Sequence, residues 1–282
     1  MYLSITSWWG AFRESLSGSS LPLGFLERVV FLFNKYSGMF LRGAYTTFVI
    51  ALIGTVFGCF IGLICGALRT IPLAPQDSLF RKIILKPLRA IIYCYIELFR
   101  GTPMMVQAMV IYYGLIMLGY RPDMMTAAIF IVSINTGAYM AESVRGGIES
   151  IDIGQTEAAK AIGMNHAGTM LYIVLPQALR NIMPQIGNNL IINIKDTSVL
   201  NVIGTVELFF QTSSVAGTYY TYFEAFTISL VMYLIMTLVC SRILRWIERK
   251  IDGADSYDLA TPDILAHTSG LLSAPPKKGG EG

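Results

Sequence analysis

The sequence predicts an all-α, polytopic membrane protein with about five transmembrane helices. Of its 282 residues, 54% are hydrophobic and only 14% are charged, which is too apolar for an ordinary soluble domain. The mean hydropathy is +0.57. Residues 43–68 contain no charge, and this run exceeds the roughly 20 apolar residues that a helix needs to cross the hydrocarbon core. These observations indicate that much of the chain is surrounded by lipid.

Four further apolar segments accompany this first expected span. The second is interrupted by Glu97 and Arg100, and the fourth carries Arg180 near its start. Buried helices of a soluble core are the alternative, but the chain has too little polar sequence to surround so many apolar segments. The expected spans are residues 43–68, 90–119, 124–141, 179–194 and 223–246.

Residues 1–40 precede the first span and are expected to form an extracytoplasmic or interfacial arm. They do not resemble a secretory signal, because residues 1–10 contain no basic side chain and no continuous apolar run follows. Residues 21–33 mix Leu, Phe and Val with Glu27 and Arg28, which favours a short helix lying along the membrane surface. A sixth span is the alternative.

The transmembrane domain is expected over residues 41–251, and the remaining residues 252–282 form a different kind of segment. This tail is polar and rich in Gly, Pro, Ser and Ala. Such a composition cannot bury enough apolar surface to fold, so we expect a disordered cytoplasmic tail. A solubilising extension explains it more simply than a docking role.

Basic residues indicate the orientation, because short loops rich in Lys and Arg remain in the cytoplasm. The loop between the second and third spans contains only one basic residue, Arg121, and is therefore expected outside. With five spans, the amino terminus is then expected outside and the carboxyl terminus in the cytoplasm. Two basic groups support this orientation: Arg69, Arg81, Lys82, Lys86 and Arg89 after the first span, and Arg242, Arg245, Arg249 and Lys250 after the last. One group opposes it: Arg13, Arg28, Lys35 and Arg42.

No motif for catalysis or metal binding is found in the sequence. The cysteines at positions 59, 65, 94 and 240 all lie inside expected spans without metal-like spacing, and His166 lacks a second ligand nearby. A nucleotide-binding loop, a catalytic triad and a dinucleotide fingerprint are also missing. We therefore predict no catalytic residue and no metal site. Energy for pumping must come from an ion gradient or from another subunit.

A spaced motif follows the third span, within residues 150–176. Residues 157–163 read EAAKAIG, and the tetrapeptide IVLP begins at Ile173 after nine further residues. The alanines suit a short helix with a small apolar surface, and Glu157 would lie near its positively polarised start. Gly163 can adopt the left-handed conformation that ends a helix. The pattern predicts an L-shaped knob that projects into the cytoplasm.

This spacing resembles the EAA loop of ATP-binding-cassette (ABC) importer permeases. In that family, EAA is followed by three residues, Gly, nine residues, Ile, any residue, Leu and Pro, and this chain has every fixed position. The resemblance implies the type I permease fold and a cytoplasmic coupling helix that docks into the ATPase. Its ATPase-coupling residues would be Glu157, Ala158, Ala159 and Gly163. An ordinary amphipathic loop helix is the alternative.

A second resemblance narrows the class. The segments IELFRGTPMMVQ (96–107), SINTGAYMAESVRGGI (133–148) and NNLIINIKDTSVLNVIG (188–204) are similar to the polar amino-acid uptake permeases, such as those for histidine and glutamine. The similarity covers residues 42–251. It implies a multi-pass protein of the prokaryotic cytoplasmic membrane that imports a polar amino acid. It also implies that this chain binds no cofactor and no nucleic acid.

The resemblance also implies several partners. An extracytoplasmic amino-acid-binding protein would deliver the substrate, and a cytoplasmic ABC ATPase dimer would use ATP and Mg. A second permease chain, identical or related, would complete the route through the bilayer. Gly54, Gly58 and Gly62 would allow close helix contact with that second chain or with spans of the same chain.

Two pairs of opposite charges lie one helical turn apart, near the cytoplasmic ends of the second and third spans. They are Glu97 with Arg100 and Glu142 with Arg145. We favour structural ion pairs over a role in transport, because such pairs also anchor helix ends in membranes.

The fourth span is expected to contribute to the translocation pathway. Gln185, Asn189, Asn193 and Asp196 share one helical face, which either lines the route or bonds to neighbouring helices. Asp196 and Lys195 interrupt the apolar run, so the helix is expected to break there. We hypothesise that they meet the ammonium and carboxylate groups of an amino acid. Alternatively, they pair with each other or line an external gate.

Two other functional classes are considered. An ion-gradient-driven secondary transporter would use intramembrane carboxylates such as Glu97, Glu142 or Asp196, but such folds usually contain inverted repeats, and none is evident. A membrane-embedded enzyme would need a catalytic cluster at one interface. For the enzyme, neither a His pair nor an activated nucleophile is evident, and a gradient-driven carrier has no use for an EAA loop.

Overall fold

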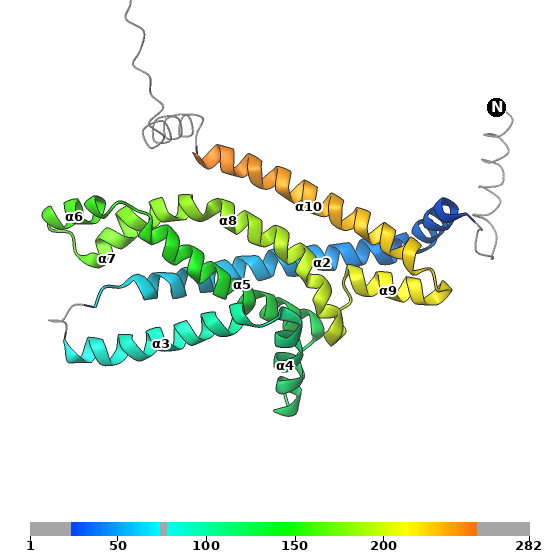
Figure 1. The fold of residues 1–282 in the computed structure, drawn as a ribbon, viewed down its shortest axis with the longest axis horizontal. Coiled ribbons are helices and arrows are strands. Elements are labelled where there is room, and N and C mark those ends of the chain that lie inside the picture. The colour runs from blue at the N-terminus through cyan, green and yellow to red at the C-terminus, as the bar shows by residue number, and fades with distance from the viewer. Residues whose placement is uncertain (1–23, 74–77, 253–282) are drawn as a thin grey trace, which may run out of the picture.

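The computed structural model describes residues 24–73 and 78–252, and every regular element in these ranges is helical. The long helices run along a common direction, whereas α4 projects away from the bundle (Figure 1). The α-helices are α2 (Phe25–Thr70), α3 (Leu79–Gly101), α4 (Met104–Met117), α5 (Met124–Glu149), α6 (Ile153–Ala161), α7 (His166–Thr169), α8 (Leu175–Asp196), α9 (Leu208–Tyr219) and α10 (Tyr222–Asp252). A π-helical turn (Met170–Val174) precedes α8, and a 3₁₀ helix (Thr197–Ile203) follows it.

Three described helices are long and apolar enough to cross a membrane: α2, α5 and α10. They contain the first, third and fifth expected spans. A fourth crossing is formed if the segments His166–Ile203 and Leu208–Tyr219, which meet at 57°, count as one bent span. The fourth expected span lies in the first of these segments, as α8.

The second expected span, residues 90–119, is not one helix. α3 ends at Gly101 and α4 begins at Met104. Pro103 causes this break, since proline has no amide proton and disfavours the helical conformation of the preceding residue. Thr102 is accordingly extended, with φ −126° and ψ 149°. The 14 residues of α4 span about 21 Å, which is too short for the hydrocarbon core.

The amino-terminal arm also differs from the expectation. Residues 25–33 form the start of α2, which continues as one 46-residue element with non-helical dihedral angles at Tyr36. Phe31 and Leu32 are buried in a cluster with Leu208 of α9 and Ile228 of α10, because these side chains find a protein partner instead of the membrane surface. The expectations for residues 1–23 and 253–282 lie outside the described residues.

α2 packs along α5 through a row of small residues. Every fourth residue of α2 from Gly54 to Gly66 is a glycine, and each faces a side chain at matching spacing on α5. A Cβ atom at Gly58, for example, would stand 2.6 Å from the Cβ of Thr136. Glycine therefore permits the close approach of the two backbones. The glycine row packs within this chain, on these pairs: Gly54–Val132, Gly58–Thr136, Gly62–Met140 and Gly66–Val144.

α5 begins after Asp123, whose carboxylate caps the helix. It accepts a hydrogen bond from the Met125 amide at 2.8 Å and others from the hydroxyl and amide of Thr126. The hydroxyl of Thr126, followed by the Met125 amide, lowers the pKa of the Asp123 carboxyl below its ordinary value. This cap fixes where the chain enters its third span.

The two ends of the bundle carry different elements (Figure 1). α6, α7 and the start of α3 lie at one end, and α10 runs toward this end. The start of α2 and α9 lie at the opposite end. Two basic residues at the second end have partners. The Arg28 guanidinium lies 3.2 Å from the Glu224 carboxylate, and Lys35 Nζ donates to the Tyr219 hydroxyl at 2.6 Å. Arg28 therefore has a carboxylate partner and Lys35 a hydroxyl partner at this end of the bundle.

Candidate translocation cavity and coupling loop

A cavity of about 310 Å³ lies where the α3–α4 break meets α5 and α8. Its wall combines amide, hydroxyl and carboxylate groups with a few apolar side chains. A compartment of this size and mixed polarity suits a small polar molecule. The lining residues are Thr102, Pro103, Met104, Asn135, Thr136, Tyr139, Asn189, Ile192, Asn193 and Asp196.

Two asparagines of α8 form part of this wall and also hold the helix in place. Asn193 Nδ2 donates to the Thr55 hydroxyl at 2.7 Å and to the Thr136 hydroxyl at 2.9 Å. Asn189 Nδ2 donates to the carbonyl of Gln185 at 3.0 Å and contacts the sulfur of Met140 at 3.0 Å. Both asparagines are buried. Asn189 and Asn193 therefore both line the cavity and bond to neighbouring helices.

A second polar group secures the break between α3 and α4. Gln107 Nε2 donates to the carbonyls of Phe99 and Thr102, each at 2.9 Å, and its Oε1 accepts from Asn135 Nδ2 at 2.8 Å. Carbonyls at the end of a helix have no partner within the helix. The Gln107 side chain supplies that partner and connects the break to α5.

The remaining predicted pathway residues are placed differently. Asp196 is the last residue of α8, half-buried, and it lines the cavity. The α-helix ends there, as the sequence predicts, and continues as the 3₁₀ helix. Lys195 and Gln185 are exposed and are not part of the cavity wall. The structure therefore brings Asn189, Asn193 and Asp196 together around the cavity, without Gln185 and Lys195.

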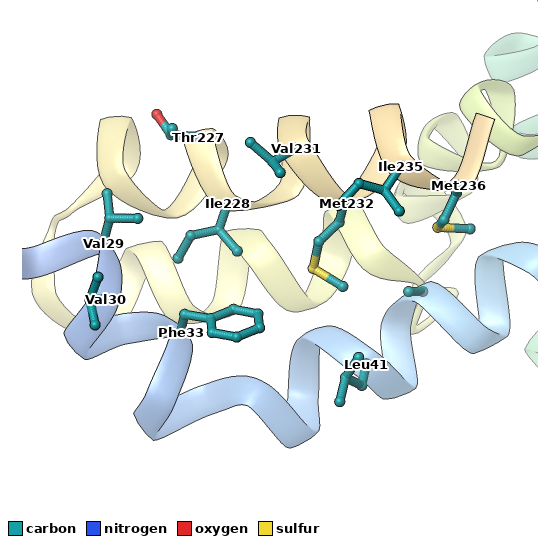
Figure 2. A pocket seen from close by; sticks show the side chains of 11 residues that line it. Val29, Val30, Phe33, Leu41, Thr227, Ile228, Val231, Met232, Ile235 and Met236 are labelled. Atoms are coloured by element: carbon teal, nitrogen blue, oxygen red, sulfur yellow. The ribbon is translucent and has the colours of Figure 1, made fainter. Parts of the chain in front are cut away.

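A larger groove, of about 530 Å³, lies between the first part of α2 and α10. Figure 2 shows its walls, which include Val29 and Phe33 on α2 and Ile228 and Met232 on α10. Thr227 is the one residue in its lining with a polar side chain. A polar solute would lose its hydration there without gaining hydrogen bonds, so this groove does not suit a polar substrate.

The predicted knob is present as α6, α7 and the turn between them. α6 begins at Ile153, after Asp152, whose side chain accepts from the Gly154 amide at 2.7 Å. Glu157 lies in the second turn of α6, because Asp152 already occupies the capping position. Ala159 is buried against the chain, whereas Glu157 and Ala158 are exposed.

Gly163 forms the turn after α6 with φ +87°. The amide of Gly163 donates to the Lys160 carbonyl and that of Met164 to the Ala159 carbonyl, both at 3.0 Å. This is the left-handed termination that the glycine predicts. Apolar side chains of the knob are exposed: Ile153 and Ile162 are 72% and 79% exposed, and Tyr172, in the π-helical turn that follows, is 78% exposed. The knob therefore presents a solvent-facing apolar surface.

The two predicted charge pairs differ in the contacts that they make. Glu142 binds Arg145, with Nε at 2.9 Å, and also Arg69 of α2 at 2.6 Å, so it ties α2 to α5 near the knob. Arg145 reaches Glu149 as well. Glu97 and Arg100 are both exposed, and the Arg100 guanidinium lies 5.8 Å from the centre of the Tyr139 ring.

Glu207 is a buried polar residue that the sequence reasoning missed. Its carboxylate caps α9, accepting from the amides of Phe209 at 2.8 Å and Phe210 at 2.6 Å. The Tyr233 hydroxyl donates to it at 3.0 Å from α10, and the Thr47 hydroxyl lies 3.5 Å away on α2. An acidic residue just before an apolar run is a capping signal. The sequence contains no comparable local signal for its partners Thr47 on α2 and Tyr233 on α10.

Comparisons with known proteins agree with this geometry. Residues 78–253 match the family described as binding-protein-dependent transport system inner membrane component. The glutamine transport system permease protein GlnP of Escherichia coli (strain K12) is 40% identical over 217 residues, which cover 76% of this chain and 93% of that protein. The arginine transport system permease protein ArtQ of Bacillus subtilis (strain 168) is 33% identical over 216 residues, covering 76% and 93%.

Solved structures share the fold. A crystal structure of an amino acid ABC transporter with histidines superposes with a TM-score of 0.69 at 34% identity, covering 81% of this chain and 99% of that chain. An inward-facing MetNI methionine ABC transporter gives a TM-score of 0.64 at 20% identity, with coverage of 77% and 98%. With its polar cavity, its EAA knob and a family match over more than half of its length, the chain belongs to the binding-protein-dependent transport system inner membrane components, the permeases of ABC importers.

Proposed function

We propose that this chain is the permease subunit of an ABC importer that carries a polar amino acid through the cavity beside Asp196. One observation carries the proposal: a polar cavity inside an apolar helical bundle occurs in the same chain as an EAA knob with an exposed apolar surface. The cavity suits a solute, and the knob suits a partner protein. A carrier driven by an ion gradient would need the cavity but not the knob.

The knob is proposed to dock into a cytoplasmic ABC ATPase dimer, which binds and hydrolyses ATP with Mg. Ile153 and Ile162 lie on either side of the EAA segment and would be desolvated by such a partner. Glu157, Ala158 and Ala159 form the helix, and Gly163 sets the turn that presents it. The knob connects α5 to α8 along the chain, so movement of the ATPase would be transmitted to these two helices.

The end of the bundle that holds α6 and α7 is assigned to the cytoplasm. The basic link between α2 and α3 and the basic end of α10 lie toward the same end, in agreement with the positive-inside rule (Figure 1). The start of α2 then lies outside, where an extracytoplasmic amino-acid-binding protein would deliver the substrate. The membrane is the prokaryotic cytoplasmic membrane.

The substrate is proposed to be a zwitterion with a polar side chain. Asp196 supplies the one carboxylate in the cavity wall, which suits an ammonium group, and Asn135 and Asn189 supply amides that suit a polar side chain. The relatives named for glutamine and arginine transport carry the same kind of solute. The permease lowers the barrier by replacing hydration with these groups.

A second permease chain, identical or related, is proposed to complete the route. Gln185 and Lys195 are exposed on α8 beside the cavity, and polar groups at membrane depth must face protein or water. A facing chain would enclose them. The same chain would cover α4, whose apolar side chains Val110 and Met117 are 67% and 88% exposed.

Uptake of labelled amino acids tests the energy source and the substrate together. Cells with and without this chain are compared under ATP depletion with a maintained ion gradient, and under a protonophore with maintained ATP. Loss of one polar amino acid's uptake that follows ATP is expected. Uptake that follows the ion gradient would instead establish a secondary transporter.

Copurification of the ATPase tests the knob. Ile162→Asp, Gly163→Asp and deletion of residues 157–159 should leave membrane insertion intact and abolish association with the ATPase. Tyr220→Asp is the matched control, because Tyr220 is 85% exposed and directly follows α9, which lies at the opposite end of the bundle (Figure 1). Undiminished copurification with all three knob variants would exclude the docking role.

Substrate preference tests the cavity. Asp196→Asn keeps the shape of the side chain and removes its charge, so uptake of a zwitterion should fall about tenfold or more if the carboxylate meets the ammonium group. Glu97→Gln, which makes the same change on an exposed carboxylate outside the cavity wall, is the control. Unchanged uptake and unchanged preference in Asp196→Asn would remove Asp196 from the route.

A further inference from the structure

The first half of α3 carries two surfaces that the transport mechanism does not use. Leu79, Phe80, Ile83 and Ile84 are between 46% and 74% exposed, and their spacing of four places them on one face. Basic side chains occupy another face. α3 has no buried residue before Ile92, although Leu88 packs against the cluster that contains Ile92 and Ile96, so this half of the helix is only partly covered by the bundle.

Two basic residues of this face, Lys86 and Arg89, have no acidic residue on α3 before Glu97. Arg81, Lys82, Lys86 and Arg89 all precede Glu97, the first acidic residue after Leu79. In the described ranges, Lys86 and Arg89 take part in no ion pair. The Arg89 Nε atom is buried and has no hydrogen-bond partner among the described residues. A buried guanidinium nitrogen without an acceptor is costly unless an anion approaches it.

This face continues onto the coupling loop. The Arg81 guanidinium lies 3.4 Å from the carbonyl of Pro72, which follows α2, and the charges of Arg81 and Lys160 both act on the imidazole of His166. A small apolar hollow of about 220 Å³ lies beside them, lined by residues that include Leu68, Ile71 and Leu171. Basic groups therefore border an apolar hollow at the end of the bundle that holds α6 (Figure 1).

We propose that the first half of α3 is a binding surface for anionic phospholipids of the cytoplasmic leaflet, through Lys86 and Arg89 at the headgroups and the adjoining apolar face at the acyl chains. A basic amphipathic helix beside a membrane span is the pattern that anionic lipids recognise. The charge complementarity favours a lipid phosphate, and the exposed Leu79 and Phe80 favour an occupant with hydrocarbon chains. The assignment to the cytoplasmic leaflet rests on the orientation given under the proposed function.

Lipid selectivity of the reconstituted chain tests this proposal without requiring transport. The full chain is placed in bilayers of phosphatidylcholine with increasing phosphatidylglycerol, and the relative association of spin-labelled forms of the two lipids is measured. The wild-type chain should prefer phosphatidylglycerol, and the preference should weaken as salt is raised. Lys86→Gln with Arg89→Gln should lower the preference about fivefold or more, from the usual contribution of each basic residue near an anionic surface.

The matched control removes two positive charges from the same end of the bundle, with Arg242→Gln and Arg249→Gln on α10. It should lower the preference clearly less than the α3 pair does, because α10 has no adjoining exposed apolar face proposed to hold the lipid. Two results would overturn the proposal: an equal loss in the control pair, which would indicate a general effect of net charge, or an unchanged preference in Lys86→Gln with Arg89→Gln. Loss of ATPase copurification in the α3 pair, with lipid preference intact, would assign this surface to the ATPase instead. Because the readout is lipid association, failure of the importer assignment would leave the result unaffected.

Discussion

Asn193 and Thr55 lie 138 positions apart in the sequence, yet Asn193 Nδ2 donates a 2.7 Å hydrogen bond to the Thr55 hydroxyl. Thr136 accepts from the same amide, so a single side chain of α8 connects α2 and α5. All three residues lie at the wall of the cavity or directly behind it. The polar stripe of the fourth span therefore positions the cavity as well as lining it.

Replacement of Asn193 should destabilise the bundle. Asn193→Leu leaves the Thr55 and Thr136 hydroxyls without their shared donor, and interhelical hydrogen bonds in membrane proteins contribute about 0.6 kcal/mol each, up to about 1.7. A loss of roughly 1–2 kcal/mol is expected in unfolding from detergent micelles. Asn188→Leu, on the exposed side of α8, is the control and should be near neutral. Equal unfolding midpoints for the two variants would contradict the assigned role of Asn193.

Gly58 should not tolerate a methyl group. A Cβ there would stand 2.6 Å from the Cβ of Thr136 and 3.1 Å from the carbonyl oxygen of Ser133, so α2 and α5 must separate. Overpacking of this kind costs about 1–3 kcal/mol. Gly114→Ala is the control, because no atom lies within 4 Å of a Cβ at that α4 position, and alanine should gain helix propensity there. Thermal unfolding should therefore shift in opposite directions for the two variants.

The sequence predicts the spans that are continuous and uncharged, and one helix end that carries charges. α2, α5 and α10 follow directly from long apolar runs, and the end of α8 follows from the charges at Lys195 and Asp196. Hydropathy alone does not show the break at Pro103, since α4 is as apolar as a span. Hydropathy does not distinguish a helix that crosses the bilayer from one that leaves the bundle at an angle.

The site is predicted where its residues share one helix, and missed where they come from several. The spacing of Asn189, Asn193 and Asp196 is local, so it identifies one wall of the cavity. Asn135 and Thr136 complete the wall from α5, and the sequence alone does not show that α5 packs beside α8, where Gly147 meets Ile182. The exposure of Lys195 and Gln185 likewise depends on how α8 is rotated, which the polar pattern alone does not determine.

Gln107 should be required for the geometry of the α3–α4 break. Gln107→Leu removes the donor to the Phe99 and Thr102 carbonyls and the acceptor for Asn135. Leaving such buried groups unpaired costs about 1–3 kcal/mol. Gln177→Leu is the control, because Gln177 is exposed and bonds only to the preceding turn of its own helix among the described contacts. A cysteine pair across the break, read by crosslinking, should lose its fixed distance in Gln107→Leu alone.

Glu207 should contribute to stability mainly through its cap on α9. Glu207→Ala removes the acceptor for the Phe209 and Phe210 amides, and loss of a cap costs about 0.5–2 kcal/mol. Glu207→Gln retains one acceptor oxygen and should lie between wild type and Ala in unfolding experiments. Glu97→Ala is the control on an exposed carboxylate of α3. If Glu207→Ala and Glu207→Gln lowered the stability to unfolding equally, the charge of Glu207, and not its cap, would be the stabilising feature.

Gly163 should act through its backbone conformation, because a side chain there would meet no neighbouring atom within 4 Å. At φ +87°, a residue with a Cβ carries a penalty of about 1–2 kcal/mol, which Asn reduces because it adopts left-handed conformations more readily. Substrate-stimulated ATPase activity should therefore fall in the order Gly, Asn, Ala at position 163. Gly146→Ala, also in open space but inside α5, should retain full activity. Full activity in Gly163→Ala would show that the knob functions without this turn, and the geometry assigned to the coupling loop would then be wrong.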